Sequence, residues 1–152
     1  MQNLKILNSK EIKIIHKNLK EQFGFEEKLN YVFLRNSNDR IYIVNRAIDR
    51  FDLEALRIDS IGLYFATVMP EGLRLSIEGS QLIGPKAQKN ILEIKDLAFE
   101  MWLKGLDFKV ETNFKDFVIV KHNNNFVGCG KIKDGSLFNY VPKARRLIVV
   151  NN

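Results

Sequence analysis

Cysteine is almost absent from this sequence, since Cys129 is the single thiol among 152 residues. One cysteine cannot form an internal disulfide, so we expect a reducing compartment and a cytoplasmic protein. The only two histidines, His16 and His122, are too far apart for metal-ligand spacing, which argues against a zinc site. No apolar run approaches the roughly 18 residues that span a bilayer, and Met1–Lys20 has no signal-peptide core, so no membrane partner is expected.

The sequence also lacks a recognisable set of catalytic residues. Cys129 stands between two glycines with no activating base nearby in sequence, and we interpret it as a packed small hydrophobe. The pair Gly128 and Gly130 lacks the third glycine of a dinucleotide fingerprint, and the run Gly84-Pro85-Lys86 lacks the phosphate-loop pattern. We expect a protein that is not an enzyme and that binds neither a cofactor nor a metal. A cleft holding ionisable groups with strongly shifted pKa values would favour an enzyme instead.

Positive charge is unevenly placed along the chain. The whole sequence has a net charge of +6 and 45% hydrophobic residues, enough for a real core. Residues 1–78 hold 12 Lys and Arg against 11 Asp and Glu, whereas residues 79–152 hold 12 against 7. This asymmetry predicts an acidic partner for the second half.

The first half predicts one amphipathic helix followed by antiparallel strands. Asn8 and Glu11 have the spacing of a capping box, and Gly24 follows the apolar face as a helix stop. Turn residues separate the β-rich runs, which indicates hairpins. The expected strands are residues 31–35, 40–44, 61–68 and 73–77, and between the second and third Asn45 is expected to cap a short helix carrying Ile48 and Phe51.

The second half predicts short strands around one helix. Gly79 and the pair Gly84-Pro85 are expected to break regular structure, and we place a domain boundary near Arg74. No flexible linker follows this boundary, so the two halves should pack closely. Asp96 is expected to cap a helix at 97–104, with Trp102 in the core. The expected strands are residues 91–94, 108–112, 117–122, 126–133 and 147–150, with turns at His122–Asn125 and Asp134-Gly135, which together suggest a small β-barrel.

The segment 126–147 combines glycines, cations and aromatic residues. Glycine lets a backbone approach a ligand closely, cations attract phosphate, and aromatic faces can stack on bases. Phe138 and Tyr140 are the aromatic candidates, although either could belong to the core. A twisted hairpin whose lysines only keep its outer face solvated explains the same composition equally well.

Several short motifs in the second half resemble those of known RNA-binding families. Residues 79–152 resemble a PUA domain. More narrowly, they resemble the PUA-like domain of Sun-type RNA cytosine-5 methyltransferases. The residues that carry this resemblance are Gly128-Cys129-Gly130-Lys131, Gly135-Ser136-Leu137, Asn139, Pro142-Lys143 and Arg146. The segment Ile83-Gly84-Pro85-Lys86-Ala87 resembles archaeal ribosome-biogenesis proteins that join an α/β domain to a PUA domain.

This resemblance implies an α+β fold in which a small α/β domain (residues 1–73) packs on a PUA-like β pseudobarrel (residues 74–152). It implies structured RNA, rRNA or tRNA, as the partner, gripped by backbone approach and cations. No counterpart of the methyltransferase domain occurs in these 152 residues. A targeting module is therefore expected, with a methyltransferase or ribosome-assembly factor acting in trans. The expected RNA-binding residues are Gly84, Lys86, Lys89, Gly128, Gly130, Lys131, Lys133, Asn139, Lys143, Arg145 and Arg146.

Two classes of binding function remain open from the sequence. One is a non-catalytic RNA-binding protein in rRNA or tRNA modification, whose cations converge on one concave flank. Lys86 should then lie near the cluster formed by residues 131–146. The other is a protein-interaction adaptor that recruits a methyltransferase or assembly factor and uses exposed tyrosines such as Tyr31, Tyr42 and Tyr64.

Overall fold

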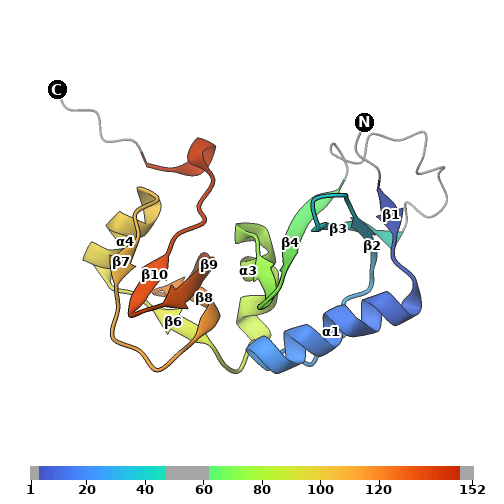
Figure 1. Cartoon of the computed structure of the whole chain (residues 1–152), viewed down its shortest axis with the longest axis horizontal. Helices are drawn as coiled ribbons and strands as arrows, with labels where there is room; N and C mark the ends of the chain where they lie inside the picture. Colours follow the sequence, from blue (N-terminus) through green and yellow to red (C-terminus); the bar gives the residue numbers. More distant parts are fainter. Residues whose placement is uncertain (1–3, 47–61, 148–152) are drawn as a thin grey trace.

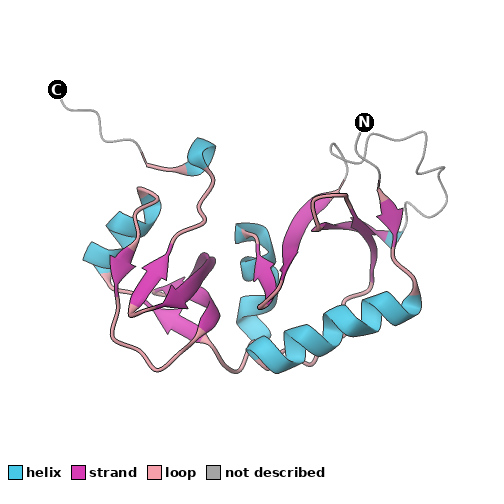
Figure 2. Ribbon diagram, viewed as in Figure 1, coloured by secondary structure: helices cyan, strands magenta, loops and turns pink. Residues whose placement is uncertain are grey.

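The protein has an α+β fold with two five-stranded sheets (Figures 1 and 2). The computed structural model describes residues 4–46 and 62–147. Within these ranges, α3 (Ile77–Ile83) lies between the two sheets, and α1 (Ser9–Phe23) runs beneath the first of them in the view of Figure 1. No helix in the described ranges has the length and apolar character needed to cross a bilayer.

The first helix begins and ends as predicted. Helix α1 (Ser9–Phe23) is capped by Asn8, whose Oδ1 accepts from the Glu11 backbone N–H at 2.9 Å. The Glu11 carboxylate in turn accepts from the Asn8 N–H, which completes the capping box. Gly24 ends the helix in the left-handed conformation. The apolar face of α1 buries Ile15, Leu19 and Phe23 against the sheet.

The first sheet is an antiparallel meander in chain order, β1-β2-β3-β4-β5. The predicted hairpins are confirmed, and their short turns force neighbouring strands to run antiparallel. Within residues 4–46 and 62–75 the chain therefore forms a helix on an antiparallel sheet, and none of the strands described there pair in parallel. The helix expected to carry Ile48 and Phe51 lies outside the described residues. The strands are β1 (Lys5–Ile6), β2 (Tyr31–Arg35), β3 (Arg40–Asn45), β4 (Leu63–Met69) and β5 (Gly72–Leu75).

The second sheet has the order β6-β8-β9-β10-β7. Strand β6 pairs parallel to β8, and the other pairs are antiparallel. The turns predicted at Asn123 and at Asp134-Gly135 are present, with positive φ at each of these residues. The strand predicted at 108–112 is shorter, and most of the one predicted at 147–150 lies outside the described residues. The strands are β6 (Ile91–Glu93), β7 (Phe108–Lys109), β8 (Asp116–His122), β9 (Asn125–Lys133) and β10 (Ser136–Phe138). The pairings describe a sheet, and its closure into a pseudobarrel stays a prediction.

Helix α3 (Ile77–Ile83) forms where the sequence predicted a break in regular structure. Ser76 caps it, because the Ser76 Oγ accepts from the Gly79 N–H at 2.9 Å. Gly79 lies inside the helix and allows it to rest directly on the Phe65 carbonyl of β4. The prediction of a break at Gly79 was therefore wrong, since this glycine serves a close helix–strand contact. Gly84 begins the short 3-10 helix η2 (Gly84–Lys86).

Helix α4 (Asp96–Leu103) covers the second sheet. Asp96 was predicted to cap this helix, but Lys95 occupies the N-cap position without a side-chain bond. The Asp96 carboxylate instead lies 2.8 Å from His122 Nε2 on β8, and the His122 ring stacks on Phe99. Trp102 is 1% exposed, which confirms its place in the core.

A hydrophobic cluster contains residues of both halves of the chain. Phe23, Phe33 and Phe65 of the first half pack in one cluster with Phe117 and Cys129 of the second sheet. Main-chain bonds add to this contact, since the N–H groups of Gln88 and Lys89 both donate to the Phe23 carbonyl. The close packing predicted for the halves is confirmed. The division into domains at residues 73 and 74 stays a prediction.

Candidate nucleic-acid interface

The three predicted RNA-binding glycines are buried inside the protein. A Cβ on Gly84 would lie 2.3 Å from the Phe126 ring, and one on Gly128 would lie 2.9 Å from Trp102 Cζ2. Gly130 is confined in the same way by the Leu137 side chain and the Phe138 carbonyl. Internal packing therefore accounts for the small size of these three residues. Their contact with RNA stays a prediction.

Asn139 stabilises the chain around itself. Its Nδ2 donates to the carbonyls of Trp102 and Leu106, and its Oδ1 accepts from the Val141 N–H at 2.7 Å. These bonds join the end of α4 to the segment that follows β10. The Asn139 side chain therefore forms hydrogen bonds inside the protein, and these bonds position the basic C-terminal segment.

Three of the seven predicted cations form ion pairs with carboxylates of the first half. Lys86 lies 3.9 Å from Glu27, Lys131 lies 3.0 Å from Glu71, and Arg145 pairs with Glu78. Acidic side chains thus lie among the cations that the sequence predicted to converge on one concave flank, and that convergence stays a prediction. Lys86, Lys131 and Arg145 each pair with a carboxylate from a different segment of the chain, and the expected proximity of Lys86 to the cluster at 131–146 stays a prediction.

The pair between Lys131 and Glu71 connects the turn between β4 and β5 to β9. The Lys131 ammonium donates to the Glu71 carboxylate and holds the pKa of that carboxyl below its ordinary 4.5. The same bond raises the pKa of Lys131. A carboxyl whose pKa is lowered by folding stabilises the folded protein. This stabilisation is fully present above pH 4.5, the ordinary pKa of the group, and is lost as the pH falls through the lowered pKa. This contact between the halves is therefore charged on both sides at neutral pH.

The other four predicted cations are available to an anion. Lys89, Lys133 and Lys143 are exposed, and none of them has a carboxylate partner within the ranges 4–46 and 62–147. The Nε of Arg146 donates to the Val141 carbonyl at 3.0 Å, and its guanidinium packs beside Gly105. They lie on different elements: Lys89 precedes β6, Lys133 ends β9 at the β9–β10 turn, and Lys143 and Arg146 begin and follow the short 3-10 helix η3 (Lys143–Arg145).

A groove between the two halves contains arginines that the sequence did not single out. It has a volume of about 240 Å³ and is bordered by β3, β4, β5, the start of α3, β9 and the segment after β10. Cations enter it from both halves, and Glu78 is the one carboxylate in its described lining. We call this hollow the arginine groove; its polar and aromatic lining residues are Arg40, Tyr64, Arg74, Ser76, Glu78, Trp102, Tyr140 and Arg145.

Two of these arginines lie side by side across three strands. Arg40 and Arg74 both pair with Thr67, one from β3 and the other from β5. The Arg40 guanidinium lies 5.0 Å from the centre of the Tyr64 ring, and that of Arg74 lies 4.3 Å from the centre of the Tyr140 ring. Cation–π attraction holds a guanidinium over an aromatic ring without using its N–H donors. No sequence motif marked Arg40 or Arg74, because strand register alone aligns them.

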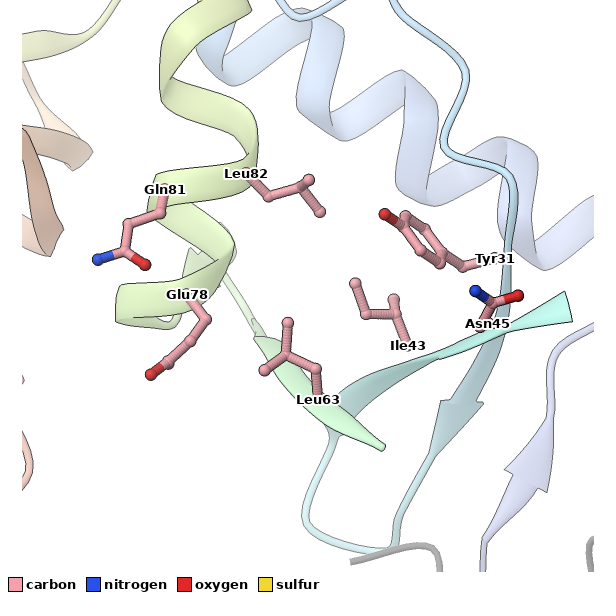
Figure 3. Close-up of a pocket in the computed structure, with 7 residues that line it drawn as sticks. All are labelled: Tyr31, Ile43, Asn45, Leu63, Glu78, Gln81 and Leu82. Atoms are coloured by element: carbon pink, nitrogen blue, oxygen red, sulfur yellow. The ribbon is translucent and has the colours of Figure 1, made fainter. Parts of the chain in front are cut away.

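A larger hollow lies between α3 and the first sheet (Figure 3). Its volume is about 490 Å³, and Tyr31, Ile43, Leu63 and Leu82 supply most of its apolar surface. Among its described lining residues it has one carboxylate, Glu78, and no cation. This hollow therefore does not suit a polyanion.

Cys129 has the environment of an unreactive thiol. It is 3% exposed, and burial raises its pKa to about 12 from an ordinary value of 9.0. At pH 8 the folded protein should therefore hold about a thousandfold less thiolate than a free thiol. We expect iodoacetamide to label the native protein far more slowly than the protein in guanidinium, as measured by intact mass. Equal labelling rates in the two states would contradict this burial.

The comparison with protein families bears on the C-terminal segment. Residues 89–147 match the family model described as the methyltransferase RsmF PUA domain. The C-terminal part of the chain carries a PUA domain. PUA domains are RNA-binding modules of methyltransferase-related proteins, and this one comprises the second sheet, α4 and the cations around η3. A search of curated proteins found no match to the chain.

Proposed function

We propose that this protein is a non-catalytic RNA-binding protein that docks structured RNA during rRNA or tRNA modification or ribosome biogenesis. The observation that carries the proposal is the PUA domain at residues 89–147. The net charge of residues 79–152, 12 cations against 7 anions, supports a polyanionic partner. A methyltransferase or assembly factor acting in trans would supply the chemistry.

The cations of the PUA domain that lack a carboxylate partner supply the phosphate contacts in this proposal, and three of them, Lys89, Lys133 and Lys143, are exposed. Lys89, Lys133, Lys143 and Arg146 have no carboxylate partner among the described residues, so binding need not break an ion pair at any of them. Lys131 and Arg145 hold carboxylates already, and RNA phosphates would have to displace these. Four to six phosphate contacts are therefore available to a bound RNA.

We expect binding to depend strongly on salt, because each neutralised phosphate releases condensed counterions. With four phosphate contacts, affinity should fall about a hundredfold between about 50 and 200 mM salt. The measurement is titration of a labelled RNA hairpin with the full chain at several salt concentrations. Affinity that ignores salt, or the absence of binding to any structured RNA, would contradict the proposed function.

Paired substitutions locate the contact surface. Lys133→Gln with Lys143→Gln should lower the salt slope by about two, since each lysine accounts for about one counterion. The matched control is Lys10→Gln with Lys13→Gln, which removes the same charge from the exposed side of α1. If the two double variants lower the slope equally, the PUA domain is not the docking surface.

A further inference from the structure

We propose that the arginine groove binds one unpaired nucleotide of the docked RNA, with Arg40 and Arg74 as its phosphate and base contacts. This inference rests on the proposed function, because it adds a site for unpaired RNA to a protein that docks structured RNA. The groove lies between the two halves, and Arg40, Tyr64 and Arg74 fall outside the residues that match the PUA family model.

The side-chain N–H groups of Arg40 and Arg74 donate no hydrogen bond to another residue within the described ranges 4–46 and 62–147. Each guanidinium lies over a tyrosine ring, and no carboxylate within the ranges 4–46 and 62–147 lies at ion-pair distance from either. Arg145, in contrast, is held by Glu78. A guanidinium fixed by stacking loses little rotamer freedom when it binds, and its planar fork matches phosphate oxygens in a bidentate manner. Arg40 and Arg74 are therefore preorganised for an anion.

The size and lining of the groove indicate what kind of anion it takes. A groove of about 240 Å³ is too small to admit a duplex. The phosphates of a duplex contact an open protein surface instead. Tyr140 is 37% exposed, and it presents an aromatic face at the mouth where an unpaired base could stack. Two cations beside stacking faces suit a nucleotide that has left a helix, such as one at an end or in a bulge.

Both halves of the protein are needed to build this site. Arg74 stands on β5 of the first sheet, whereas Tyr140 follows β10 of the second. The ion pairs between Lys131 and Glu71 and between Arg145 and Glu78 hold these two walls together. The first half thus supplies a wall of the RNA site and not only a support for the PUA domain.

The test compares two RNAs that differ in a single feature. Both are the same hairpin, closed by a polyethylene glycol linker so that its loop has no unpaired nucleotide, and one has an additional unpaired adenosine at its 3′ end. The full chain should bind the extended hairpin about tenfold more tightly, because a stacked base contributes about 1–3 kcal/mol. Arg40→Gln with Arg74→Gln should abolish this preference while the chain still binds the blunt hairpin. Circular dichroism checks that each variant is folded.

Two further variants separate stacking from charge. Tyr140→Leu keeps both arginines and should reduce the preference severalfold, and Arg74→Lys keeps the charge but loses the planar fork and should also reduce it. Lys10→Gln with Lys13→Gln removes two charges far from the groove in sequence and should leave the preference unchanged. This control distinguishes a specific contact from a loss of net charge.

The outcomes keep the two proposals apart. If the wild type binds both hairpins equally, or if Arg40→Gln with Arg74→Gln retains the preference, the groove does not hold the unpaired nucleotide. The groove would then serve another ligand, such as an acidic peptide, while the proposed function stands. If the wild type binds neither hairpin, the proposed function fails and the groove proposal fails with it.

Discussion

Trp102→Ala is expected to destabilise the protein by about 4 kcal/mol, because a fully buried aromatic side chain is replaced by a cavity. Trp102 is 1% exposed and fills the space beside Gly128 and Gly130 on β9. Its indole N–H also donates to the Val127 carbonyl at 3.1 Å, so the substitution leaves that acceptor without its partner. Helix α4 would lose its main contact with the second sheet.

The measurement is guanidinium unfolding followed by far-ultraviolet circular dichroism. Tryptophan fluorescence cannot follow this variant, since Trp102 is the only tryptophan. Leu97→Ala is the matched control, because Leu97 lies on the same helix and is 75% exposed, and its loss should change stability by less than about 0.5 kcal/mol. Similar losses for the two variants would show that the indole does not hold α4 on the sheet.

Gly79→Ala is expected to destabilise the protein by about 3 kcal/mol, although alanine is the best helix former. A Cβ on Gly79 would lie 2.2 Å from the Phe65 carbonyl oxygen, and that atom belongs to the backbone of β4. The neighbouring Ser76 fixes this approach, since its N–H donates to the Phe65 carbonyl and its Oγ donates to the Tyr64 carbonyl at 2.6 Å. The added methyl group can be accommodated only if α3 moves away from the sheet.

Two controls isolate the close contact in this second experiment. Gln81→Ala in the same helix is exposed and should be nearly neutral, within about 0.5 kcal/mol. A Cβ on Gly135 would meet no atom within 4 Å, but the φ of this residue is +74°. Gly135→Ala should therefore destabilise the protein only by the left-handed backbone penalty of about 1 kcal/mol. Thermal melting should show Gly79→Ala about 10 °C below the wild type. A melting temperature at or above that of the wild type would contradict the contact.

Local chemistry made the first half largely predictable. The capping box of Asn8 and Glu11, the stop at Gly24 and the hairpin turns each depend on residues within a few positions of one another. The turn at Asp134-Gly135 follows the same logic. Such features need no information about the rest of the chain.

The structural role of several glycines could not be predicted from the sequence. Gly79 has the same local signal as a helix breaker, yet the Phe65 carbonyl above it requires a residue without a side chain inside the helix. Gly128 and Gly130 were predicted to face RNA, and their partner within the protein is Trp102. A sequence shows that a position is small, whereas only the fold shows which atom lies there.

By itself the sequence determined the helix α1, the hairpins, the basic second half and its resemblance to a PUA domain, because all of these depend on residue type and on short spacings. The tertiary structure decided which cations are neutralised and which are not. Glu71 and Glu78 of the first half meet Lys131 and Arg145, while strand register aligns Arg40 with Arg74. The physical reason is that an electrostatic surface depends on distances between residues far apart in the chain, and only folding sets those distances.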